Sequence, residues 1–401
     1  MNRLTKNILQ YNTLTWSAIF FSFSFGLGIA LNSIGFVLFC ATGFIYSIGD
    51  IRKKTLTFSS NIVLYIIIGY FTLIVLREVI ANISTAPEIV FYYLAFLFIP
   101  TIFLFQSKRL LKHHQVVLMA FVVGMAFNAF INLSFGFYRG VLIRDHGVNF
   151  WYFTYNLLSE PFGIQPIYLG CFYVIALLIL LHFKTYLKSL TFFYCLIVLL
   201  IISVFLLAAR NAILSMIILI PLYLFLTKKI TVKNSILLLG IFAICFVSAI
   251  QNPVVKNRIL KVTTKGNFYS GSSLRNNIWQ SAISASNENF IWGSGEMKAS
   301  LLLLHEFEKR DLIIPLKYKY HSHNQFLNTL IQYGIVGLGL LIVLFIIAMW
   351  ITWKDGNYLG LGITLLFLFT MLTESIFTRQ WGVFSFPFFI SLLVMKKKSQ
   401  N

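Results

Sequence analysis

Long runs of apolar residues, broken by short polar or charged stretches, make up most of this chain. A helix that spans a membrane needs about 20 mostly apolar residues, and runs of roughly this kind recur along the sequence. The predicted spans cover residues 13–31, 33–49, 61–76, 89–105, 116–138, 164–183, 190–209, 212–227, 235–250, 334–353, 359–377 and 384–395. We therefore predict an all-α integral membrane protein with about twelve transmembrane helices, of which the last is the shortest.

One polar stretch, residues 251–333, stands apart from the other connections. It is too long for a simple link between two helices, and loops of this length usually carry function. Residues 274–286 and 297–310 read as helices on either side of the loop Gly293-Ser294-Gly295. The chain is thus expected to divide into a bundle of about nine helices (1–250), a large loop with short helices and the candidate chemistry (251–333), and C-terminal helices with a basic tail (334–401).

The composition agrees with a membrane protein. The 401 residues are 58% hydrophobic and 11% charged, with a mean hydropathy of +0.83, whereas soluble globular domains are about 25% charged. The four cysteines lie inside apolar runs without CxxC spacing, which favours neither a disulfide framework nor a zinc site. The first apolar run is long enough to span a bilayer, so we do not expect a cleavable signal peptide.

The charges of the loops predict the orientation of the chain. The net charge is +20, but Lys and Arg concentrate in cytoplasmic loops of membrane proteins, so their positions matter more than their sum. With the N-terminus inside, seventeen cations fall on the inner side, and the short outer loops carry only Arg77, Arg139, Arg144, Arg210 and Arg379. We expect both termini in the cytoplasm and the large loop outside. The excess of positive charge is then explained by the orientation of the chain in the membrane, and it does not indicate a nucleic-acid partner.

The outer cations in short loops are all arginines, a side chain suited to bidentate binding of phosphate. Arg210 interrupts an apolar run, and an arginine at membrane depth is costly unless it faces a wet cavity or a partner. The alternative is a turn residue that reaches the lipid headgroups. Arg275 lies in a predicted first helical turn that Ser273 could cap, where its guanidinium and free backbone N–H groups could bind one anion. The alternative there is a solvated loop residue.

The third candidate is the run His321-Ser322-His323-Asn324, which precedes a short amphipathic helix with Leu327, Leu330 or Ile331 on the face of His323. A neutral imidazole can take a proton from a hydroxyl near neutral pH. His321 and His323 could instead form half of a metal site, although no acidic pair or third histidine lies at a supporting spacing. A histidine at a helix start can also be a simple capping or surface residue.

His323-Asn324, nine residues and then Gly334-x-x-Gly337 together resemble the signature of the O-antigen ligase family and its Wzy-type polymerase relatives, and Arg210 and Arg275 fit the same resemblance. It implies a metal-independent, cofactor-free and inverting glycosyltransferase of the GT-C type in the bacterial inner membrane, with its active site in the periplasm. The implied donor is a glycan on undecaprenyl pyrophosphate, and the implied acceptor is a sugar hydroxyl of lipid A core or another glycan, both held at the membrane lipid.

The resemblance also implies roles for single residues. Arg210 and Arg275 would bind the pyrophosphate, and His323 would position or deprotonate the acceptor hydroxyl. Further candidates for the site are Arg77, Arg144, Arg379, His321 and Asn324, while Gly334 and Gly337 would allow close helix packing.

Two other functions remain open on the sequence. A Wzy-type polymerase of O-antigen or exopolysaccharide would use the same donor and the same residues on a different acceptor. A transporter or flippase could also have twelve spans, but such proteins tend to show repeated halves and polar residues at mid-membrane. Here the candidate charged residues gather at the outer side and one outer loop is enlarged, which disfavours a transporter. The complete His motif, which polymerases keep less regularly, favours the ligase over the polymerase.

Overall fold

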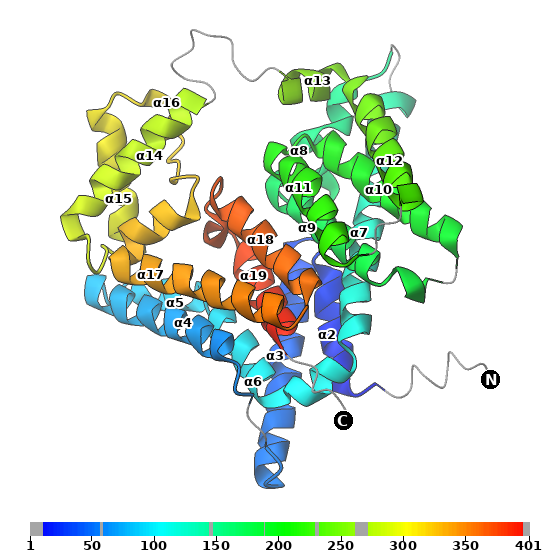
Figure 1. Cartoon of the computed structure of the whole chain (residues 1–401). Helices are drawn as coiled ribbons and strands as arrows, with labels where there is room; N and C mark the ends of the chain where they lie inside the picture. Colours follow the sequence, from blue (N-terminus) through cyan, green and yellow to red (C-terminus); the bar gives the residue numbers. More distant parts are fainter. Residues whose placement is uncertain are drawn as a thin grey trace. The chain divides into compact units, whose positions relative to one another are not determined.

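The protein is helical throughout the part of the chain that the computed structural model describes, residues 11–56, 59–143, 147–187, 189–228, 232–260 and 272–395, and these residues form no strand (Figure 1). Among them, five helices are long and apolar enough to cross a membrane: α3 (Ile29–Arg52), α4 (Ile62–Ala81), α7 with its π-helical extension (His114–Leu142), α10 (Leu190–Leu207) and α17 (Gln325–Lys354). The pair α5 (Ala86–Tyr92) and α6 (Ala95–Lys112) could form a sixth span, bent by 45°.

Shorter apolar helices lie at the remaining predicted spans: α2 (Thr13–Ser24), α9 (Pro166–His182), α11 (Arg210–Leu226), α12 (Val232–Ile250), α18 (Tyr358–Met371) and α19 (Gln380–Val394). Many apolar side chains of the long helices are exposed, for example Ile45 of α3 and Ile346 of α17, as expected of surfaces that face lipid. The chain is therefore a multi-pass membrane protein, and the count of twelve spans stays a prediction.

The helices form two compact units, which do not follow the order of the chain. Unit 1 comprises Met1–Ser60, Ile102–Leu260 and Met395–Asn401, and unit 2 comprises Asn61–Thr101 and Lys261–Val394. From residue 272 onward the large loop groups in one unit with α4, α5 and the last three helices, whereas its first helix, α13 (Pro253–Leu260), belongs to unit 1. The expected division at residues 250 and 333 describes sequence order and is not tested by this grouping.

Unit 1 is built around α9, which is apolar on all sides and buried along almost its whole length, as a helix at the centre of a bundle must be. It packs against α7, α10 and α11. The predicted boundary between the first two spans, near residue 32, is wrong, because α2 ends at Ser24 and α3 begins at Ile29. The break follows from a close backbone approach: a Cβ on Gly26 would lie 2.3 Å from the carbonyl oxygen of Gly124 in α7.

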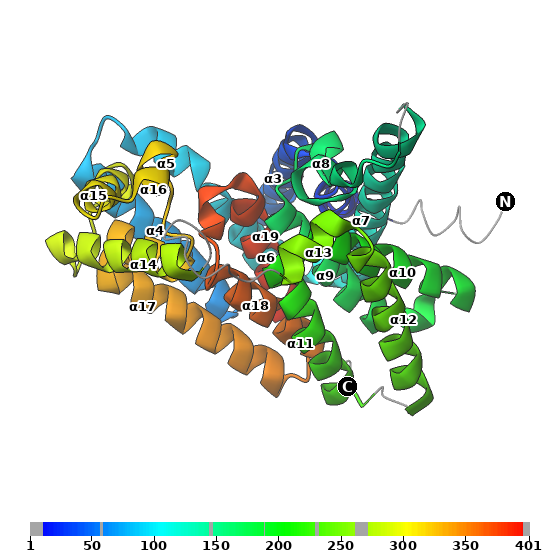
Figure 2. The ribbon, with the colours of Figure 1, turned by 90° about the horizontal axis from the view of Figure 1, so that it is seen from above.

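Unit 2 is built around α19, in which every residue from Trp381 to Val394 is buried. This helix packs against α4, α17 and α18. Figures 1 and 2 both show α4 and α17 side by side. The shortest predicted span is therefore the central helix of its unit.

The large loop has a hydrophobic core of its own. Its helices in unit 2 are α14 (Ser272–Ser286), α15 (Glu296–Lys309) and α16 (Ile313–Lys317), which confirms the two helices predicted from the sequence. Buried Ile278, Leu303 and Phe307 pack together with Ile331 of α17, and Leu327 packs against them from the side. The apolar face predicted after His323 thus joins the loop to the start of α17.

A break in α17 at Gly334 provides a second join. Gly334 has φ +65° and ψ −167°, and the loop segment before α15 lies against this break. Ile335 N donates to Phe290 O at 2.8 Å, Ser294 N to Ile331 O at 2.9 Å and Gly295 N to Gln332 O at 2.9 Å. A Cβ on Gly334 would lie 2.2 Å from Ile291 O. Gly334 therefore lets the loop backbone cross the helix, whereas Gly337 lies near Leu73 of α4.

We expect Gly334→Ala to destabilise the protein by about 1–3 kcal/mol, the cost of a side chain in such a backbone conformation, with the clash against Ile291 added. Gly339→Ala is the matched control, because a Cβ there meets nothing within 4 Å and alanine is the better helix former. Thermal unfolding in detergent measures both. Equal melting temperatures for the two variants would contradict the role of Gly334.

Candidate active site

The turn before α17 is held in one conformation by its own polar groups. The Asn324 side-chain oxygen accepts from Phe326 N at 2.9 Å and Leu327 N at 3.2 Å, so Asn324 caps the helix. His323 directly precedes this cap with φ +48°, a left-handed conformation that few residues other than glycine adopt. Such outliers cluster at functional sites, and this one sits at the histidine of the sequence motif.

A second segment, residues 372–377, which follows α18 and includes the start of the short helix η6 (Ile376–Thr378), lies against this turn. Asn324 N donates to Ser375 Oγ at 3.2 Å, and the Asn324 side-chain amide donates to Leu372 O at 3.2 Å. Phe377 N donates to Gln325 Oε1 at 2.8 Å. These bonds fix the two segments together, so the side chains between them keep a defined geometry.

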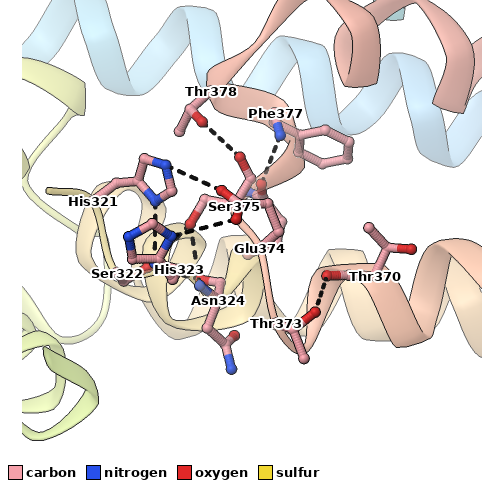
Figure 3. A network of polar contacts seen from close by, with 11 residues as sticks. His321, Ser322, His323, Asn324, Thr370, Thr373, Glu374, Ser375, Phe377 and Thr378 are labelled. Atoms are coloured by element: carbon pink, nitrogen blue, oxygen red, sulfur yellow. Dashed lines mark hydrogen bonds and ion pairs between the residues drawn. The ribbon is translucent and has the colours of Figure 1, made fainter. Parts of the chain in front are cut away.

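The joined segments bring two histidines onto one carboxylate (Figure 3). His321 Nε2 lies 3.1 Å from Glu374 Oε1, and His323 Nδ1 lies 3.4 Å from Glu374 Oε2. The Glu374 side chain is only 6% exposed, whereas the two imidazoles are 28% and 27% exposed. The carboxylate is thus buried beneath two rings that outside molecules can reach.

The Glu374 carboxyl is charged at neutral pH. Burial raises its pKa, but hydrogen bonds from His321 and His323 lower it further than burial raises it, to about 2. A buried charge is tolerated when hydrogen bonds satisfy it, and here the two imidazoles do so.

The cluster also has the chemistry of a metal site, because two imidazole nitrogens and a carboxylate oxygen are common zinc ligands. The ligand atoms of His321, His323 and Glu374 lie within 4.8 Å of one another. However, His323 N donates to His321 Nδ1 at 3.1 Å. His321 Nδ1 is therefore unprotonated, and a neutral His321 carries its proton on Nε2. A nitrogen that carries a proton cannot bind a metal, so this arrangement favours a hydrogen-bonded cluster.

A comparison with known protein families matches one part of the chain. Residues 195–342 match the family model described as O-antigen ligase. This stretch, less than half of the chain, is similar to the O-antigen ligase family. A comparison with curated proteins finds no relative that matches the chain.

The match confirms the resemblance predicted from the sequence, and members of this family are membrane glycosyltransferases of the ligase or polymerase type. The matched stretch contains Arg210, Arg275, His321, His323 and Asn324, but ends before Glu374. Glu374 is the residue that sequence reasoning missed. It lies 51 residues beyond His323, and no local spacing marks it.

Unit 2 also contains three of the predicted arginines. Arg275 lies in the first turn of α14 and is exposed, as expected, although the Ser273 side chain that was predicted to cap the helix lies outside the described part. Arg379 is exposed and directly precedes α19. Arg77 of α4 is half-buried, and its Nε has no hydrogen-bond partner among the described residues. Arg144 lies outside the described residues.

Arg210 belongs to unit 1, where it is the first residue of α11. Its Nε and Nη2 donate to the carbonyl oxygen of Arg258 at 3.0 and 2.8 Å. The guanidinium of Arg258, in α13 (Pro253–Leu260), lies over the ring of Tyr155 at 3.3 Å from its centroid. Two exposed arginines therefore adjoin each other, and Arg258 was not singled out by the sequence because it stands among other basic residues.

Proposed function

We propose that this protein is an O-antigen ligase that transfers a glycan from undecaprenyl pyrophosphate to a sugar hydroxyl of lipid A core. The observation that carries the proposal is His323, a solvent-accessible imidazole held at the start of α17 inside the stretch that matches the O-antigen ligase family. A base in this position can take the proton of a hydroxyl nucleophile.

In the proposed reaction, the acceptor oxygen attacks the anomeric carbon of the donor from the face opposite the pyrophosphate. The new glycosidic bond forms as the bond from the anomeric carbon to the phosphate oxygen breaks, which inverts the configuration. The hydroxyl proton moves to His323, and the polyprenyl pyrophosphate leaves with the bonding electrons. Its growing negative charge calls for fixed cations, for which we propose Arg275 and Arg210, with Arg77, Arg144 and Arg379 as further candidates.

Guanidinium groups can take the place of a metal in this chemistry, because they bind phosphate oxygens through two parallel hydrogen bonds. The proposal therefore needs neither metal nor cofactor. The long lipid tail of the donor would stay in the bilayer while its phosphates lie at the outer surface. We accordingly propose a GT-C-type enzyme of the bacterial inner membrane, with both termini in the cytoplasm and the loop that carries His323 in the periplasm.

Examination of the glycolipids after deletion of the gene tests this function. A ligase deletion leaves lipid A core without polymer, while the lipid-linked polymer accumulates. The Wzy-type polymerase, which would share donor and residues, predicts core that bears a single repeat unit. A glycolipid profile identical to that of the parent strain would contradict both. Re-expression of the wild-type protein, which should restore the profile, is the control.

A further inference from the structure

We propose that Glu374 is a positioning residue that, together with His321, holds His323 in the tautomer whose Nε2 is the base. This inference rests on the proposed function and names the group that makes His323 competent for it. Neutral histidine has two tautomers, and only the one with its proton on Nδ1 offers Nε2 as a base.

The tautomer of His321 is fixed first, by the backbone. The N–H of His323 can only donate, and its partner at 3.1 Å is His321 Nδ1, so His321 Nδ1 must accept. The left-handed conformation of His323 accompanies this contact within the turn. A neutral His321 therefore carries its proton on Nε2 and donates it to Glu374 Oε1 at 3.1 Å.

The second carboxylate oxygen then decides the state of His323. Glu374 Oε2 is a pure acceptor, because the carboxyl is ionised, and it lies 3.4 Å from His323 Nδ1. The stable arrangement is Nδ1–H donating to Oε2, which leaves the lone pair of His323 on Nε2. When Nε2 takes the proton of the acceptor hydroxyl, the adjacent carboxylate stabilises the imidazolium. The buried carboxylates of hydrolase triads have this role.

The surroundings of Glu374 hold its carboxylate toward the two imidazoles. Its side chain is 6% exposed, and the next residue, Ser375, accepts from Asn324 N and contacts Ser322 Oγ. The ring of Tyr320 packs edge-on against His323, with centroids 5.3 Å apart. Figure 3 shows both imidazoles directed at the one carboxylate. The cluster thus aims one nitrogen of His323 at Glu374 and leaves the other available.

The first test is Glu374→Gln. An amide has one accepting oxygen and one donating nitrogen, and the oxygen would be taken by His321 Nε2–H, which cannot change its role. The amide nitrogen would then face His323 Nδ1 and force the proton onto Nε2, the wrong tautomer. We expect kcat for glycan transfer to fall by about 10²–10⁴-fold, the usual contribution of a general base, with the KM for the donor little changed. Glu374→Asp, which keeps the charge, should retain at least ten times the activity of Glu374→Gln.

A double-mutant cycle separates positioning from a merely structural role. If Glu374 acts through His323, Glu374→Gln should cause no further loss of kcat in the His323→Ala background, because residues that act as a unit are not additive. If the kcat of the double variant fell by the product of the two single-variant losses, the proposal would be overturned. Near-normal activity of His323→Ala alone would instead contradict the proposed function. A failure of the positioning role can therefore be distinguished from a failure of the proposed function.

The second test is a rescue. In His321→Phe/Glu374→Gln the amide oxygen has lost its first donor and can accept from His323 Nδ1–H, which restores the productive tautomer. We expect the double variant to exceed Glu374→Gln in kcat at least tenfold, whereas His321→Phe alone should lose less activity than Glu374→Gln. A double variant no better than Glu374→Gln overturns tautomer selection. Inactivation of the wild type by a chelator with recovery on addition of Zn²⁺ would also overturn it in favour of a metal site. Melting temperatures of all variants verify that each is folded.

Discussion

Replacing His323 with alanine should abolish glycan transfer, with a loss of about 10²–10⁴-fold in kcat. The other imidazole on Glu374, that of His321, has both its Nε2–H and its Nδ1 engaged in hydrogen bonds, so it offers no free nitrogen in place of His323. The measurement is transfer from a purified undecaprenyl-pyrophosphate donor to lipid A core by protein reconstituted in liposomes. Because His323 lies in a turn and not in a helix core, the variant should still insert and fold.

The matched control for this experiment is His305→Ala. His305 is an exposed histidine on α15 of the same loop and is not part of the cluster, so its loss should leave transfer near the wild-type rate. His323→Ala with more than half of the wild-type activity would contradict the assignment of the base.

The second large effect is expected from Arg275→Lys. Lysine keeps the positive charge but loses the planar fork that binds two phosphate oxygens at once. Hydrogen bonds to charged groups contribute about 1.5–3 kcal/mol, so the loss of one such bond predicts a fall of roughly 10- to 100-fold in kcat/KM for the donor. Donor titrations with the reconstituted protein measure this parameter.

Arg310→Lys is the matched control for charge and loop. Arg310 lies in the same loop, where it hydrogen-bonds Gln280 and Ser284 and pairs with Glu306. Its replacement therefore shows how much an Arg-to-Lys change in the loop costs at a residue that is not proposed to bind the donor. Arg275→Lys with unchanged kcat/KM would remove Arg275 from the pyrophosphate site. Arg210 gives a less clean test, because its guanidinium also supports α13 through Arg258 O.

Much of the secondary structure could be predicted because it depends on local patterns. A helix that spans a membrane requires a long apolar run. The apolar runs of the sequence therefore located a helix at each predicted span. The helices of the large loop were recognised in the same way, by polar and apolar positions at helical spacing. Errors arose where two distant backbones touch, as at Gly26 and Gly124, since local hydropathy does not record such an approach.

The candidate site was predicted in part. The motif identified His323, and the cap at Asn324 agrees with its place at a helix start. The partner of the histidines was not predicted, because Glu374 was taken as part of the span predicted for 359–377; that span is wrong at its end, since α18 stops at Met371 and Glu374 lies in the short loop after it. The role of Gly334 was also understated, because helix packing was expected where a loop backbone crosses the helix.

The sequence by itself determined the helical, membrane-spanning character of the chain and its resemblance to the O-antigen ligase family, and it singled out His323 as the candidate base, since these depend on composition, on spacing within one helix and on a continuous motif. Only the tertiary structure decided that His321 and His323 share the carboxylate of Glu374. That contact depends on the packing of α17 against α18 and α19, which brings residues 321–325 and 372–377 within hydrogen-bond distance. A protonation state set by such a contact is a property of three-dimensional proximity, and no linear pattern encodes it.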